Sequence, residues 1–213
     1  AVVLTGTGDY RGILRYPLGR ISLNETTVSN SRIPISSWEA LANMPTGAES
    51  AGKTFVLTQD LDQNSPGYDT YASLTANAGE GWQPVGDSTN PFMGSFDGNG
   101  HTISDLKIDT SAGDQGLFGY FEGNVTIKNL TLQDIELIST EDDVGGIVSY
   151  IKDASNVQIE DILITGTSLI KGNDEVGSLV GQNEGRLTIR NSNNNANVLG
   201  REGENSDRVG GLV

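Results

Sequence analysis

The chain has 213 residues, no cysteine and a formal net charge of −15 at pH 7. These features exclude a disulfide scaffold and a thiolate metal site, and the negative charge argues against nucleic acid or an anionic membrane surface as a partner. No apolar run approaches the about 18 residues of a membrane span, so membrane insertion is not expected. The 28 glycines and the frequent Asn and Asp favour tight turns between short strands.

The N-terminal part differs in pattern from the rest. Residues 1–35 are interpreted as N-terminal strands or as the end of a preceding segment, and the role of residues 1–31 stays open. Ser36 and Glu39 have the spacing of a capping box, which predicts a short helix over 37–44, and a strand follows over 54–58. We expect residues 36–100 to form a cap and the first turns, because an open solenoid end exposes unpaired strand edges. Residues 63–90, rich in Asn, Gly, Ser and Thr, are predicted to be a long loop.

The segment 101–213 repeats. One motif starts at Gly116, Gly146, Ser178 and Gly211, in steps of 30, 32 and 33 residues. A second motif occupies 125–132, 157–164 and 187–194, in steps of 32 and 30. Two motifs that share one period indicate a repeat architecture.

The spacing of apolar residues inside one repeat predicts short strands. Apolar residues occur at 125 and 127, at 130 and 132, and at 135 and 137, with two polar residues between the pairs. Alternation within each pair is typical of a strand, and the polar pairs indicate bends. Such a unit finds partners for its backbone only by stacking on copies of itself. We therefore predict an all-β solenoid, a parallel β-helix, with a short N-terminal capping helix; a β-propeller fits less well because its blades need about 40 residues or more.

Three sets of polar residues are candidate sites. An acidic ridge, defined here as Asp142, Asp143, Asp174 and Glu175, is expected to stack on one side of the solenoid, with 204–207 roughly above it. It could bind calcium, or it could be a solvated loop edge. Asp60 and Asp62 are placed on one face of a strand and could bind calcium, act as an acid/base pair or simply end the strand. Asn129, Asp161 and Asn191 share one slot after the first strand of each repeat and are predicted to form a structural ladder.

Catalysis finds little support in the residue types. The single histidine, His101, would occupy the slot of Val125 if 102–108 is a repeat 24 residues before 126–132, so it is expected to be packed in the core. With one histidine, no cysteine and no H-E-x-x-H motif, no catalytic residue or cofactor is predicted beyond the candidate calcium. Trp38 and Trp82 could stack on sugars or pack the cap.

The motifs also resemble a known family. Residues 96–103, 116–119, 127–130 and 144–148, together with 54–62 and 82–86, resemble the GLUG repeats of bacterial surface proteins. The resemblance covers 36–213, with Ser178 in place of a motif glycine and an incomplete last unit, so we expect a piece of a longer protein. GLUG repeats occur in filamentous-haemagglutinin-like adhesins and in the non-catalytic N-terminal region of immunoglobulin-A-cleaving metalloproteases. The resemblance implies a right-handed β-helix on a secreted or cell-surface protein.

We therefore predict an adhesin or stalk segment that mediates cell adhesion without catalysis. A host-surface protein or a carbohydrate would bind to the 63–90 segment or to the acidic ridge. Two alternatives remain. One is a polysaccharide lyase or hydrolase on a β-helix, which predicts an outward groove with converging carboxylates and a basic residue. The other is a non-catalytic accessory region of a surface metalloprotease.

Overall fold

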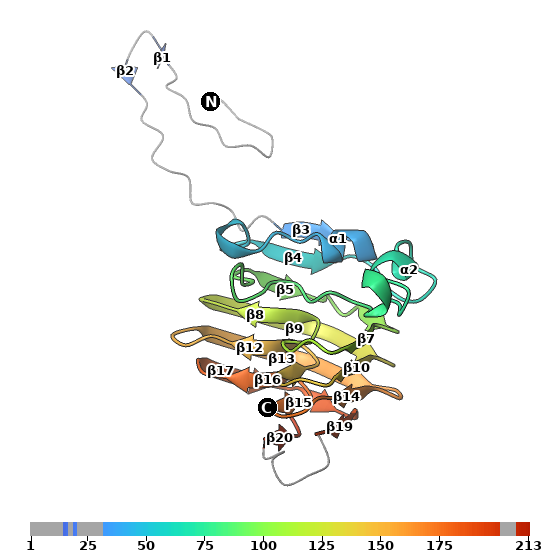
Figure 1. Ribbon diagram of the computed structural model, residues 1–213. Helices are drawn as coiled ribbons and strands as arrows, with labels where there is room; N and C mark the ends of the chain where they lie inside the picture. The colour runs from blue at the N-terminus through green and yellow to red at the C-terminus, as the bar shows by residue number, and fades with distance from the viewer. Residues whose placement is uncertain (1–14, 17–18, 21–31, 201–207) are drawn as a thin grey trace. The chain divides into compact units, whose positions relative to one another are not determined.

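The computed structural model describes residues 15–16, 19–20, 32–200 and 208–213, which fall into two compact units, 1–31 and 32–213. In the first unit the described strands are β1 (Arg15–Tyr16) and β2 (Gly19–Arg20), which pair antiparallel. In the second unit the named strands pair in parallel, and successive coils stack as flat layers (Figure 1). The predicted fold class, an all-β solenoid, is confirmed, and the parallel pairing excludes the propeller.

The largest sheet forms one wall of the solenoid. Its main order is β17-β13-β9-β5-β4-β3, with β6 paired to β9 and β18 to β13. Its strands are β3 (Arg32–Ile35), β4 (Thr54–Leu57), β5 (Ser95–Asp97), β6 (Thr102–Ser104), β9 (Asn124–Gln133), β13 (Asn156–Thr165), β17 (Arg186–Arg190) and β18 (Asn193–Asn194). Val157 lies opposite both Val125 and Leu187, as the two predicted steps require. Pro34 lies in β3 at the edge of this sheet, where a residue without an N–H is tolerated.

Three smaller sheets complete the coils. The second wall contains β7 (Lys107–Thr110), β10 (Glu136–Ser139), β14 (Leu169–Lys171) and β19 (Asn197–Leu199). The third contains β8 (Phe118–Phe121), β12 (Val148–Ile151) and β16 (Val180–Asn183). A narrow sheet of two-residue strands joins β11 (Val144–Gly145), β15 (Val176–Gly177) and β20 (Val209–Gly210).

The bends inside a coil depend on left-handed backbone conformations. Asn129, Asp161 and Asn191 have φ of 54°, 54° and 49°. Asn and Asp adopt this region more readily than other residues with a Cβ. Each lets two neighbouring side chains point outward, after which the strand resumes its alternation. This is why β9 and β13 keep one apolar face on both sides of the bend.

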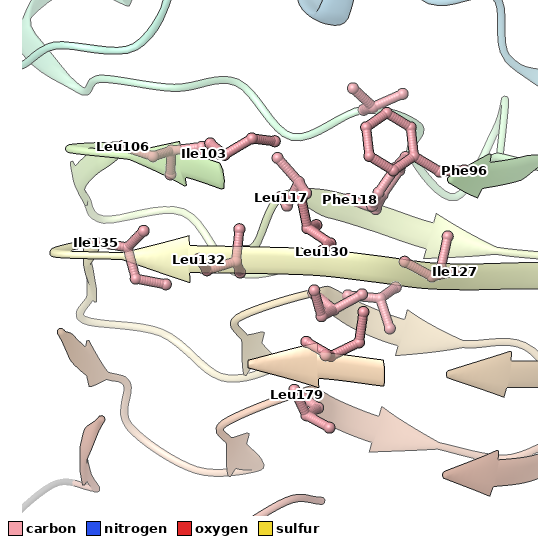
Figure 2. Close-up of a cluster of buried hydrophobic side chains, with 14 of the residues drawn as sticks. Phe96, Ile103, Leu106, Leu117, Phe118, Ile127, Leu130, Leu132, Ile135 and Leu179 are labelled. Carbon is pink, nitrogen blue, oxygen red and sulfur yellow. The ribbon is translucent and has the colours of Figure 1, made fainter. Parts of the chain in front are cut away.

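The interior is a continuous apolar core whose side chains point between the walls from several coils (Figure 2). In the N-terminal coils it is aromatic: the ring of Phe92 lies 5.7, 4.9 and 6.0 Å, centroid to centroid, from those of Phe55, Phe118 and Phe121. In later coils the same interior is filled by Ile, Leu and Val. The coils therefore share one core and stabilise each other by burial.

The N-terminal helix begins one residue later than the sequence indicated. Helix α1 (Trp38–Ala42) has Ser37 as its N-cap, and the Oγ of Ser37 accepts a hydrogen bond of 3.1 Å from the amide of Ala40. The predicted cap at Ser36 is wrong, and Glu39 is consequently one position too early for a capping box. The adjacent pair of serines offered two caps, and the structure selects the one that turns Trp38 and Leu41 into the core.

The segment 63–90 has more structure than a loop. It contains α2 (Tyr68–Tyr71) and a 3-10 turn, η2 (Asn77–Gly79); another, η1 (Gly47–Glu49), precedes β4. Trp82 is buried, its amide donates to the carbonyl of Lys107, and its indole Nε1 donates to that of Leu117. The excursion therefore returns to the wall and forms part of the core.

Candidate functional site

Acidic side chains gather along one edge of the solenoid, where the two-residue strands begin. The register of Gln115, Val144 and Val176 places Asp114, Asp143 and Glu175 one residue earlier on three successive coils. These three residues, the acidic column, have φ of 61°, 60° and 46°. Each left-handed residue allows the chain to turn into its strand.

The acidic ridge partly coincides with this column. Asp142 and Asp174 lie beside it, and the Oδ1 of Asp142 accepts hydrogen bonds from Asn173 Nδ2, at 2.7 Å, and from the amide of Asp174, at 3.1 Å. Arg208 is next in line, with its guanidinium 3.2 Å from Asp174 and 2.6 Å from Glu175. The chain therefore offsets two of the stacked charges with a cation from the next coil. The 204–207 part of the ridge lies outside the described residues.

Asp143 is the most perturbed member of the column. Burial, followed by the charges of Glu175, Asp114 and Asp142, raises its pKa to about 7. Burial also raises the pKa of Asp114 and of Glu175. Among the described side chains, the Oδ1 of Asp143 is a buried atom without a hydrogen-bond partner. An ionised carboxylate in this position works against the fold.

Two tyrosines pack beside the column. The rings of Tyr120 and Tyr150 stack 4.8 Å apart at an angle of 28°, on adjacent strands β8 and β12. Burial and the neighbouring Asp114 raise the pKa of Tyr120 to about 12. A hydrogen bond to Glu184, with burial second, raises that of Tyr150. Both hydroxyls therefore stay protonated over the physiological range.

Asp60 and Asp62 follow β4, which ends at Leu57, and flank the buried Leu61, which forms an isolated parallel bridge with Ile103. The two carboxylates have different hydrogen-bond partners. The Oδ1 of Asp60 accepts a hydrogen bond from the amide of Thr102, which together with other bonds lowers its pKa. Asp62 instead accepts from Ser65 and from the amide of Asn64, as in an Asx turn.

His101 does not point into the core. Thr102 lies opposite Thr131, a step of 29 residues, so the predicted step of 24 and the core slot of His101 are wrong. The His101 side chain is 31% exposed and its Nδ1 lies 3.0 Å from the Oδ1 of Asp60. Residues 95–97 form β5 and occupy the first-strand position instead.

Among the described residues, no group of three or more His, Cys, Asp or Glu side chains is arranged to hold a metal ion. Calcium binding by the acidic ridge, or by Asp60 or Asp62, stays a prediction. The ladder slot is visible in the register, which places Asn129, Asp161 and Asn191 on successive coils. Asn129 Nδ2 donates a 3.0 Å bond to the Oδ1 of Asp97 on β5.

Asp97 is a residue that sequence reasoning missed. Its side chain is 6% exposed, and its Oδ2 lies 3.2 Å from Arg32 and 3.8 Å from Lys128, so it joins three coils. Burial opposes ionisation of Asp97, but the hydrogen bonds from Asn129 and Asn99, together with Lys128 and Arg32, lower its pKa. Asp114 was also missed, although it stands before Gln115 as Asp143 stands before Val144, and that spacing could have revealed it.

A cleft of about 570 Å³ opens beside the N-terminal coils, between the end of α1, helix α2 and residues 81–86. Trp82 lies in its wall but is 1% exposed and packs edge to face against Trp38, at 6.0 Å between ring centroids. Both tryptophans therefore pack the cap, and neither presents an open face to a sugar. A second depression of about 370 Å³ adjoins the cleft.

Comparison with known proteins finds two partial relatives. The chain is 32% identical over 122 residues to halomucin of Haloquadratum walsbyi, which covers 56% of the chain but 1% of that protein. It is 38% identical over 85 residues to a protein of Evansella cellulosilytica described as a Gly-rich membrane protein, covering 38% of the chain and 9% of the relative. The chain therefore matches a small part of each relative's length.

No family model matches the chain, so its membership of the GLUG family remains a prediction. No solved structure matches it either. In the described part of the chain no helix is long and apolar enough to cross a membrane. Fold and relatives together define a class: a repetitive β-solenoid similar to short stretches of two much longer proteins, one of them described as a membrane protein.

Proposed function

We propose that this chain is a non-catalytic segment of a secreted or cell-surface protein, and that it serves as a stalk or adhesive rod. The observation that carries the proposal is the continuous parallel pairing of successive coils. Strands β9 and β13 alone align over nine residue pairs, and β13 continues the ladder to β17. A coil stack of this kind lengthens by adding coils, and each coil needs only its neighbours for stability.

Three further observations support a surface role. One relative is described as a membrane protein, and both matches cover small stretches of long chains, as expected for a repeated module. The net charge of −15 favours solubility of an extended surface. Several acidic side chains, among them Asp62, Asp97 and Asp174, are held by hydrogen bonds or ion pairs, which gives them structural roles.

The proposal is tested on intact producing cells. Antibodies against the chain should label unpermeabilised cells, and external protease should remove the label. An in-frame deletion of the sequence for 32–213 should reduce attachment to a surface that the parent strain colonises, while a deletion elsewhere in the same protein serves as the control. Labelling only after permeabilisation, or unchanged attachment of the deletion strain, would contradict the proposal.

A further inference from the structure

The cleft beside the N-terminal coils has an unusual lining for so acidic a chain. The chain contains 28 acidic and 13 basic residues, yet no charged side chain lines this cleft. The polar lining consists of amides and hydroxyls: Asn43, Thr46, Thr70, Tyr71, Asn77 and Gln83. Uncharged hydrogen-bonding groups match a ligand that is itself rich in hydroxyls and carries no charge.

The cleft combines a buried apolar floor with an exposed polar rim. Met44 and Val85 are 5% and 4% exposed, whereas Asn77 and Gln83 are exposed and Tyr71 is half-buried. With the other described residues, the Tyr71 hydroxyl and the side-chain amides of Asn77 and Gln83 make no hydrogen bond. A sugar ring presents C–H groups on its faces and hydroxyls at its edge, and so matches such a floor and rim.

The floor and wall are fixed before a ligand arrives. The amides of Trp82 and Val85 donate to the carbonyls of Lys107 and Leu117, at 2.7 and 3.2 Å. A Cβ at Gly81 would lie 2.1 Å from the carbonyl oxygen of Lys107, and φ there is 88°, so the wall approaches the next coil as closely as glycine permits. A preformed wall lowers the entropy cost of binding.

The residues that line the adjoining depression disfavour negatively charged ligands. This depression shares Gln83, Pro84 and four other residues with the cleft, so the two adjoin, and together they are called the groove. Its additional lining includes Glu80, Asp87 and Asp114, and neither depression is lined by Lys or Arg. Uronate, sialate, sulfate and phosphate groups would meet like charge without a cation to pair with.

We propose that this groove binds a neutral oligosaccharide. This inference rests on the proposed function and deepens it, because it names the ligand through which a surface rod would attach. The full 213-residue chain is first applied to a glycan microarray that carries neutral hexose and N-acetylhexosamine oligosaccharides together with uronate-containing and sialylated ones. The neutral glycan that gives the strongest signal is then titrated by isothermal calorimetry.

Three variants locate the site. Tyr71→Phe and Gln83→Ala should each weaken binding roughly fivefold to tenfold, as expected for the loss of one hydrogen bond. Gln158→Ala removes an exposed amide on β13 and should leave binding unchanged. Circular dichroism and unfolding midpoints equal to those of the parent chain show that the variants are folded. Both site substitutions alter exposed or half-buried side chains, so folding should survive them.

Several results would overturn the inference: no neutral glycan bound, acidic glycans bound as tightly, or equal affinities for the parent and both groove variants. Binding of protein ligands alone would also overturn it. A chain that reaches the cell surface but binds no neutral glycan refutes this inference and leaves the proposed function standing. A chain that never reaches the surface refutes the proposed function whatever the glycan result.

Discussion

Replacing Asp143 by asparagine should stabilise the protein in a pH-dependent manner. The carboxyl of Asp143 has a buried, unpartnered Oδ1 and faces Asp114, Asp142 and Glu175, with Arg208 as the one cation of this described cluster that opposes them. An amide keeps the size of the side chain and removes the charge. Asparagine also tolerates the left-handed φ of 60° at this position.

The size and the pH dependence of this stabilisation follow from the raised pKa of Asp143. The pKa of Asp143 lies at about 7 in the folded protein, against an ordinary value of 3.8. Stability contributed by the protonated form is fully present below about pH 4 and is lost as the pH rises through 7. At about 1.4 kcal/mol per pH unit the full difference is about 4 kcal/mol. Because the side chain is only partly buried and solvent screens it, we expect about 2 kcal/mol at pH 8 and little at pH 4.

The assay is urea unfolding of the parent chain and of Asp143→Asn at pH 4, 6 and 8, followed by circular dichroism. The free energy of unfolding of the variant should exceed that of the parent by an amount that grows from pH 4 to pH 8. Asp109→Asn, which neutralises an exposed carboxylate on β7, should show no such growth. A gap of the same size at every pH, or a variant less stable than the parent at pH 8, would refute the reasoning.

Three further predictions concern the coil stack. Gly146→Ala should cost about 1–3 kcal/mol because its Cβ would lie 2.3 Å from the carbonyl oxygen of Ser178, whereas Gly211→Ala, with open space around it, should change the unfolding midpoint little. Phe118→Ala should cost about 3–5 kcal/mol in denaturant unfolding, since the ring is fully buried among three other phenylalanines; a loss below about 1 kcal/mol would contradict the packing. Calcium binding at the acidic ridge would raise the thermal midpoint relative to chelator, an effect that Asp174→Asn should abolish; identical midpoints would reject calcium.

The repeating part of the fold was predictable because its apolar pattern lies within a few consecutive residues and because two motifs share the same period. The pairs Val125 and Ile127, then Leu130 and Leu132, show the strand period and the bend within eight residues, and the register confirms the step to Val157. Prediction failed where the coil contains an insertion. The 24-residue step assigned to 102–108 ignored β5, because Phe96 is flanked by Asp97 and three glycines within 94–100, which resemble a turn. Its pairing with β4 and β9 identifies it as a strand.

The site was harder to predict because it depends on which residues face each other across coils. Stacking of Asp143 with Glu175 follows from a 32-residue step, and the structure places them on adjacent coils. Asp114 escaped notice because a Gln rather than a Val follows it. The sequence suggested 63–90 as a binding segment but did not reveal the groove. Tyr71 and Gln83 are brought to one cleft by two short helical turns and by the return of Trp82 to the wall, and none of these has a periodic signal.

The regular coils and the 63–90 insertion have different roles, which follow from how a solenoid is built. A coil of about 30 residues consists of short strands and tight bends, and stacking such coils continues the same ladders from coil to coil. The cleft of this chain is lined in part by the extra residues of 63–90. That extra chain would be a mobile loop if it did not return to the core. Trp82, however, is buried and donates hydrogen bonds to the carbonyls of Lys107 and Leu117. Trp82 therefore belongs to the core and also fixes the wall of the groove, so we expect ligand recognition in this insertion and mechanical strength in the regular coils.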